Sequence, residues 1–147
     1  MKGLDYFYVD HLKDRLAYCN FAFQTMKKYL PSQFSQEDWI AELDRRENLG
    51  NFQIGRHTLL PHIEVEGIER SRINLLLLQK PLMWSEDIQD VYLIVTFLVK
   101  KDGRDLGRRD LLRMINWLAE EEIESDVLAL RNVEELEAYL SQVFDEG

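Results

Sequence analysis

Histidines and arginines are concentrated in one irregular segment of the chain, residues 44–68. Its sequence is DRRENLGNFQIGRHTLLPHIEVEGI, and it holds three arginines and two of the three histidines of the chain, His57 and His62. An imidazole can act as a nucleophile or bind a metal, and a guanidinium binds anionic oxygens through directional hydrogen bonds. Functional residues are often placed on loops that a rigid scaffold presents, so this composition predicts a site. A solvated connection between two elements is the alternative interpretation.

The two histidines of this segment are poorly placed to share a metal ion. They are five residues apart, so in a straight strand they would lie on opposite faces, and no carboxylate or thiolate stands at a spacing that would complete the ligands. We therefore expect no metal. His57 is expected at the surface, at the rim of a site, and His11 in solvent. From the residues alone, His62 is as well explained by a structural or exposed histidine as by a nucleophile.

Two helices are expected before the end of this segment. Apolar residues spaced by three and four predict a first helix over about residues 9–30, which Pro31 ends. Ser35 is suited to cap a second helix, and Gly50 can end that helix in a left-handed conformation. The site segment therefore begins inside a helix and continues into extended chain.

Helical spacing returns near the carboxyl end and predicts helices over about residues 108–146. Asn132, with Glu135 three residues later, resembles a capping box and opens the last of these helices. The side chains expected on the buried face of that helix are Val133, Leu136, Leu140 and Val143. The glutamates between positions 120 and 124 are expected on solvated faces.

Between the two groups of helices the chain has the pattern of strands. The runs 73–78 and 91–99 are short and almost continuously apolar, as expected of strands that helices cover on both faces. Residues 51–66 are strand or loop, since Pro61 disfavours helical angles for the residue before it. These elements predict an α/β fold, a single domain over residues 1–147 built as a three-layer α/β/α sandwich with a small mixed β-sheet.

Composition excludes several classes of function. The chain has 147 residues, of which 46% are hydrophobic, enough for one core and not for two domains. Its net charge of −9 argues against a nucleic-acid binder, which needs an excess of cations. The longest apolar run is about half the roughly 20 residues that cross a bilayer, so we expect no membrane insertion. The first residues do not form a secretory signal, and the single cysteine, Cys19, fits a reducing compartment, so we expect a cytoplasmic protein.

The order of short motifs in the site segment is more specific than its composition. In chain order the motifs are Arg46-Glu47-x-Leu49-Gly50, Ile54-Gly55, Leu60-Pro61-His62 and Gly67-Ile68, followed by Pro81, Trp84 and the pair Leu111-Leu112. This order resembles the type-2 EIIA domains, the fructose and mannitol class of IIA, of the bacterial phosphoenolpyruvate-dependent sugar phosphotransferase system (PTS). The resemblance covers about residues 39–144.

The resemblance implies a phosphohistidine carrier, a phosphotransferase component. In it, His62 accepts a phosphoryl group from the carrier HPr and passes it to a IIB component for sugar uptake, without a cofactor. An imidazole with a pKa near 6.5 is mostly neutral at cytosolic pH and needs no base to act as a nucleophile. Pro61 would help to orient the ring, and Arg46, at the arginine position of the family, would stabilise the phosphoryl oxygens. Arg45 should point elsewhere.

Two positions depart from the family pattern. Aligning Leu111 and Leu112 with the family places Arg108 where relatives have a second histidine, and Gly55-Arg56-His57 replaces a Gly-Asn-Gly turn. Arg108, Arg56 and His57 are therefore candidates to bind the substrate phosphoryl group. The alternatives to sugar transport are a regulatory IIA-like domain, of a PTS-controlled transcription regulator or of the nitrogen branch, and a binding module that is not phosphorylated. The sugar, the oligomeric state and whether the chain is part of a longer protein stay open at this stage.

Overall fold

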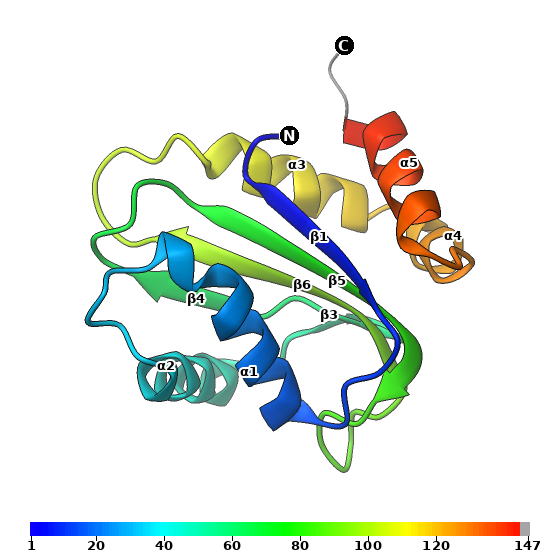
Figure 1. Ribbon diagram of the computed structural model, residues 1–147, viewed down its shortest axis with the longest axis horizontal. Helices are drawn as coiled ribbons and strands as arrows, with labels where there is room; N and C mark the ends of the chain where they lie inside the picture. The colour runs from blue at the N-terminus through cyan, green and yellow to red at the C-terminus, as the bar shows by residue number, and fades with distance from the viewer. Residues whose placement is uncertain (145–147) are drawn as a thin grey trace.

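The computed structural model describes residues 1–144 as one α/β unit (Figure 1). Its elements in chain order are β1 (Leu4–Val9), α1 (Arg15–Met26), the 3-10 turn η1 (Lys27–Tyr29), α2 (Gln36–Leu49), β2 (Gln53–Gly55), β3 (Thr58–Leu59), β4 (His62–Val65), β5 (Arg72–Leu82), β6 (Val91–Lys100), α3 (Arg108–Leu118), α4 (Ile123–Leu128) and α5 (Val133–Phe144). No helix within these residues is long and apolar enough to cross a membrane.

The sheet is mixed, as predicted. Its strand order is β1-β5-β6-β3-β2, and β4 also pairs with β6. β5 and β6 are antiparallel and occupy the centre, while β1 runs parallel to β5, and β3 and β4 run parallel to β6. One edge of β6 is thus shared by two short consecutive strands, with Thr58 of β3 beside Leu93 and His62 of β4 beside Phe97.

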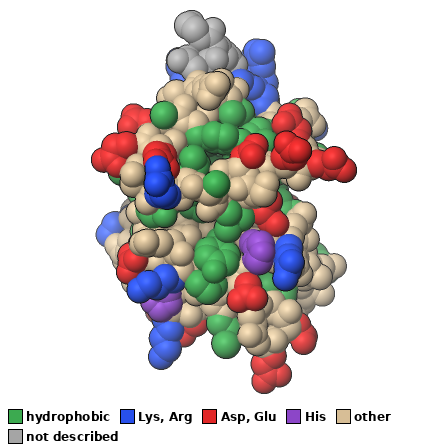
Figure 2. Space-filling view, turned by 90° about the vertical axis from the view of Figure 1, so that its right-hand side faces the viewer, with side chains coloured by type: hydrophobic (Ala, Val, Ile, Leu, Met, Phe, Trp, Pro, Cys, Tyr) green, Lys and Arg blue, Asp and Glu red, His purple; other side chains and the backbone are tan. Residues whose placement is uncertain are grey.

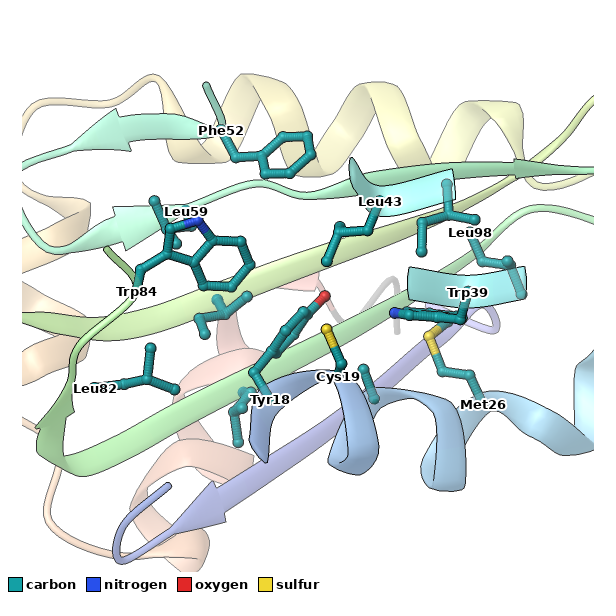
Figure 3. Packing of buried hydrophobic residues seen from close by; sticks show 14 of the residues in the cluster. Tyr18, Cys19, Met26, Trp39, Leu43, Phe52, Leu59, Leu82, Trp84 and Leu98 are labelled. Atoms are coloured by element: carbon teal, nitrogen blue, oxygen red, sulfur yellow. The ribbon is translucent and has the colours of Figure 1, made fainter. Parts of the chain in front are cut away.

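Helices cover both faces of the sheet and complete the predicted sandwich (Figure 1). On one face, α1 and α2 pack against alternate residues of β5 and β6, and Tyr18, Met26, Trp39 and Leu43 fill the interior (Figure 3). On the opposite face the intervening residues of the same strands pack against α3, α4 and α5. The main contributors there are Leu75, Leu77, Leu93, Val95, Met114, Trp117, Leu136 and Leu140. Burial on both faces explains why the two central strands are continuously apolar.

The start of the chain differs from the sequence prediction. Residues 4–9, rich in aromatic side chains, form a strand beside β5, and the first helix begins at Arg15 and not near residue 9. The Asp14 side chain caps this helix by accepting from the backbone N–H of Ala17 at 3.0 Å. Ser35 caps the second helix with a capping box, as expected, but Gly50 ends that helix with an extended φ of 167° and not in a left-handed conformation.

The carboxyl-terminal helices begin at Arg108 as predicted, and the last two positions of the predicted range, 145 and 146, lie outside the described residues. In α5, Leu136 and Leu140 are buried as expected, but Val133 is 42% exposed and Val143 is 36% exposed. Phe144 completes the buried face in their place.

Candidate functional site

β4 is the short strand that carries His62. Its burial alternates, so that Ile63 and Val65 are in the core while His62 and Glu64 are half-buried on the opposite side of the strand. Pro61 supports the position of the histidine, since its carbonyl accepts a hydrogen bond from the backbone N–H of Phe97 on β6 at 2.9 Å. The strand therefore fixes the backbone of His62 against the centre of the sheet.

The surroundings of His62 keep its imidazole neutral. Burial lowers the pKa of His62 below its usual 6.5, and the positive charge of Arg46 lowers it further. A hydrogen bond with the backbone of Leu60 and the negative charge of Glu42 oppose this shift without cancelling it. The neutral ring has one N–H, which donates to the backbone carbonyl of Leu60, and the other ring nitrogen of His62 is unprotonated. Phe52 packs edge-on against the ring, with centroids 5.6 Å apart.

Arg46 reaches this region from the last turns of α2, the helix that packs against β4. Its side chain is 19% exposed and forms an ion pair with Glu64. The Nε of Arg46 is buried and makes no hydrogen bond to any of residues 1–144. Arg45, one position earlier, is 57% exposed and forms two hydrogen bonds with Glu42 at 2.9 and 3.0 Å. Arg45 thus points away from the site, and Arg46 faces it.

Two carboxylates that the sequence analysis did not single out complete the cluster. Glu64 pairs with Arg46, and Glu42 accepts a hydrogen bond from the backbone N–H of Glu64 at 3.3 Å. Both positions had a signal in the sequence. Glu64 is two residues after His62 on a strand, and Glu42 is four residues before Arg46 on a helix, so each pair shares a face.

Arg108 stands at the first position of α3, after the loop that follows β6. Its side chain is exposed, and it forms no hydrogen bond or ion pair with any other residue of the described chain. The helix start itself is held by packing, because Gly107 lies so close to the backbone of Ser71 that a Cβ at this position would clash with it. The structure thus leaves the Arg108 side chain in solvent and brings it into no bonded contact with His62 or Arg46.

Arg56 and His57 occupy the turn between β2 and β3. The carbonyl of His57 accepts from the backbone N–H of Tyr92, whereas His62 lies beside Phe97, five residues further along β6. At about 3.3 Å per residue this separates the two histidines by about 17 Å along the strand direction. The Nδ1 of His57 lies 2.8 Å from the carbonyl oxygen of Asp90. The structure therefore places Arg56 and His57 in a region separate from His62.

Glu124 was expected in solvent, and this prediction is wrong. Its carboxylate accepts hydrogen bonds from the backbone N–H of His57 at 2.9 Å and from the hydroxyl of the buried Thr58 at 2.5 Å. Gly55 allows this approach, because a Cβ there would overlap the carboxylate. Glu124 thus fastens the β2–β3 turn to α4, a contact between residues about 66 positions apart that no local pattern reveals.

Other reactive groups are not arranged for chemistry. Within residues 1–144, no group of three or more histidine, cysteine or acidic side chains is placed to hold a metal ion. Burial raises the pKa of the Cys19 thiol to about 11, so this side chain stays protonated in the core. Acidic, basic and apolar side chains are interspersed on the face drawn in Figure 2, which carries no continuous basic field.

An α/β sandwich that presents a neutral, half-buried histidine beside an arginine has the arrangement of a histidine phosphocarrier domain. The chain belongs to the EIIA 2 family of the phosphoenolpyruvate-dependent sugar phosphotransferase system, whose model matches residues 22–143. The match begins earlier than the resemblance seen in the sequence, so that it includes the carboxyl-terminal end of α1. No curated protein sequence matches the chain.

Solved structures of the same fold include proteins of this system. The nitrogen regulatory protein IIA-Ntr from Neisseria meningitidis is 18% identical, with a TM-score of 0.73 over 95% of this chain and 97% of that one. The mannitol-specific cryptic phosphotransferase enzyme IIA CmtB from Escherichia coli is 20% identical, with a TM-score of 0.68 over 92% and 91%. Enzyme IIA of the Escherichia coli mannitol system, in complex with phosphorylated enzyme IIB, is 13% identical, with a TM-score of 0.65 over 93% and 94%.

Proposed function

We propose that His62 is the phosphoacceptor of a IIA phosphocarrier, taking a phosphoryl group from a phosphorylated HPr-like protein in the cytoplasm and passing it to a IIB component. One observation carries this proposal. His62 is half-buried on β4, and its pKa is lowered by burial and by the nearby guanidinium of Arg46, which keeps a ring nitrogen unprotonated. Membership of the EIIA 2 family supports the same assignment.

The transfer needs no cofactor. The unprotonated nitrogen of His62 attacks the phosphorus of the donor's phosphohistidine, a new N–P bond forms as the donor's N–P bond breaks, and the donor imidazole leaves with the electron pair. In the second half of the cycle, the nucleophile of the IIB component attacks the same phosphorus, and His62 leaves as a neutral imidazole. The side-chain N–H that Leu60 engages stays in place throughout.

Arg46 is the residue we assign to the phosphoryl oxygens. Its guanidinium has five N–H donors, and its Nε is buried, makes no hydrogen bond to any of residues 1–144 and lies 4.0 Å from the Glu42 carboxylate. A buried donor left unpaired costs roughly 1 to 3 kcal/mol, so a phosphoryl oxygen would recover that free energy. We assign no part in transfer to Arg56 and His57, which lie elsewhere, and Arg108 is assigned to the exposed surface that a partner reaches.

The phosphoryl group on His62 has two candidate uses, sugar uptake and regulation. Transfer to a IIB component for sugar uptake is our first candidate, and the solved mannitol IIA–IIB complex has this fold. A regulatory role is the second candidate. The observation that favours it is the acidic character of the site, where Glu42 and Glu64 accompany one arginine directed at His62. Two carboxylates oppose a second anion, so the degree of phosphorylation would follow the supply of donor closely.

The test is incubation with phosphoenolpyruvate, enzyme I and HPr, followed by measurement of acid-labile phosphoryl groups. We expect one such group on the wild-type protein and none on His62→Ala. The matched control is His11→Ala, which removes an exposed histidine and should leave labelling unchanged. A wild-type protein that acquires no label would instead be a binding module that has kept the fold.

A further inference from the structure

The ion pair between Arg46 and Glu64 lies at the histidine that we propose to be phosphorylated. Glu64 is on the same side of β4 as His62, two residues further on and therefore about 7 Å away along the strand. It uses a terminal nitrogen of Arg46 that would otherwise be free to bind a phosphoryl oxygen. The unphosphorylated site is thus already occupied by an anion of the protein.

Glu42 is not equivalent to Glu64 although both are acidic. The carboxylate of Glu42 accepts two hydrogen bonds from Arg45 and one from the backbone N–H of Glu64, and its Oε2 also lies 4.0 Å from the Nε of Arg46. These donors offset the negative charge of the Glu42 carboxylate. The carboxylate of Glu64 has Arg46 as its one partner among the described residues. Any group that draws Arg46 away leaves Glu64 with an uncompensated charge in a half-buried position.

We propose that Glu64 is a positioning residue that competes with the phosphoryl group on His62 for Arg46, and so makes phospho-His62 a readier donor. The inference rests on the proposed function. In the resting protein, Glu64 holds the guanidinium beside the histidine. After phosphorylation the guanidinium is shared between two anions, and their repulsion raises the free energy of the phosphorylated form. That free energy favours onward transfer over storage of the group on His62.

The sizes of the charges support an effect large enough to measure. A phosphoryl group carries about −1.5 to −2 charges at neutral pH. Direct repulsion from a carboxylate about 7 Å away changes such an equilibrium several-fold even in water, and the hold of Glu64 on the Arg46 guanidinium adds to that change. Removing the charge of Glu64 should therefore raise the equilibrium constant for phosphorylation of His62 about tenfold.

The experiment measures that equilibrium directly. Phosphorylated HPr and the protein are mixed without any IIB component, and the ratio of the two phosphohistidines is followed by phosphorus NMR. In Glu64→Gln we expect the ratio to move about tenfold toward this protein, and the rate of transfer from it to IIB to fall. The matched control is Glu66→Gln. It removes an exposed carboxylate, just beyond the end of β4, that pairs with the Nζ of Lys101 at 3.7 Å. It should leave the ratio within twofold.

A second variant separates positioning from a general charge effect. If Glu64 acts through Arg46, the change caused by Glu64→Gln should shrink when Arg46→Gln is already present. An equal change in both backgrounds would show that Glu64 acts on the phosphoryl group alone and would overturn the competition for Arg46. Should Glu64→Gln not fold, Glu64→Asp shortens the reach to Arg46 and should move the ratio in the same direction by less.

The outcomes distinguish this inference from the proposed function. If neither the wild-type protein nor Glu64→Gln is labelled, His62 is not a phosphoacceptor and the proposed function fails. If both are labelled and their equilibrium ratios agree, the function stands and the inference about Glu64 is overturned. A ratio that moves toward HPr in Glu64→Gln would mean that Glu64 supports the phosphorylated form, which also overturns it.

Discussion

Two histidines lie along the same edge of the central strand β6, and each has an arginine and a glutamate nearby. His57, in the β2–β3 turn, follows Arg56 and donates its backbone N–H to Glu124. His62, at the start of β4, stands beside Arg46, which pairs with Glu64. In the first region the glutamate fastens the turn and the arginine is exposed, whereas in the second the arginine is turned toward the imidazole. The same three residue types thus form a structural contact in one place, in which Glu124 holds the β2–β3 turn against α4, and a candidate reaction centre in the other.

The difference arises from which element supplies each partner. Arg56 and His57 are neighbours in one turn, so their side chains diverge, and Glu124 accepts from the backbone N–H of His57, reaching it from a helix on the α3–α5 side of the sheet. Arg46 comes from α2, which packs against β4, so it can be directed at a residue 16 positions later in the chain. Partners supplied by a different element can converge on a ring, whereas adjacent residues in a turn cannot.

The largest expected contrast is the loss of one histidine or the other. His62→Ala should abolish phosphoryl labelling by HPr, because no other described imidazole has the same arrangement. His57→Ala should retain labelling, since His57 lies about 17 Å away along the strand direction. Acid-labile phosphate counted on both variants tests this directly. Labelling lost in His57→Ala, with the fold intact by circular dichroism, would make the β2–β3 turn part of the site.

The two arginines provide the next contrast. Arg46→Gln should slow labelling about a hundredfold, the usual cost of removing one donor that stabilises a developing anion. Arg56→Gln should change the rate by less than about twofold, because Arg56 is exposed in the turn. Rates from rapid quenching at saturating donor would show the difference. Equal slowing in both variants would contradict the separation of the two regions.

The contact of Glu124 with the β2–β3 turn should affect the free energy of unfolding and not the rate of labelling. Glu124→Ala leaves the N–H of His57 and the hydroxyl of the buried Thr58 without an acceptor, which should lower the free energy of unfolding by about 1 to 3 kcal/mol. Glu124→Gln retains one acceptor oxygen and should cost less. Urea titration gives both values. A loss of labelling in Glu124→Ala, at urea concentrations where the variant is folded, would show that the Glu124 contact also positions His62.

The comparison also shows what could be predicted from the sequence. The central strands and the starts of α2 and α3 were predicted correctly, because continuous apolar runs, the Ser35 cap of α2 and the helical spacing in α3 are local signals. β1 was missed because its residues are a strand through pairing with β5, almost 70 positions later, while the step from Val9 to Leu12 imitates a helix.

The candidate site was predicted in part for the same reason. His62 and Arg46 were found from the order of motifs, but the pairing of Arg46 with Glu64 depends on how α2 packs on β4. The same limit applies to Glu124, whose partners are on another element. Arg108 matches a histidine position of the family by alignment alone, and the structure leaves its side chain exposed at the first position of α3.

The smallest expected effect concerns protonation of His62. Its pKa in the folded protein is below 6.5, so the unfolded chain binds more protons as the pH falls below about 6.5. The contribution of His62 to stability is therefore complete above that pH and is lost progressively as the pH falls through the folded value. The labelling rate should follow the same direction, staying constant above pH 6.5 and falling only below the lowered pKa.

Variants that remove a charge near His62 should shift its pKa, the midpoint of its titration, in opposite directions. Arg46→Gln removes a positive charge and should raise the pKa of His62, while Glu42→Gln removes a negative charge and should lower it. Proton NMR of the ring follows each midpoint, and Arg56→Gln should leave it in place because Arg56 lies in the other region. A midpoint that Arg56→Gln moves as far as Arg46→Gln does would mean that the two regions share one electrostatic environment. A shift confined to Arg46 and Glu42 would support α2 as the element that tunes the nucleophile.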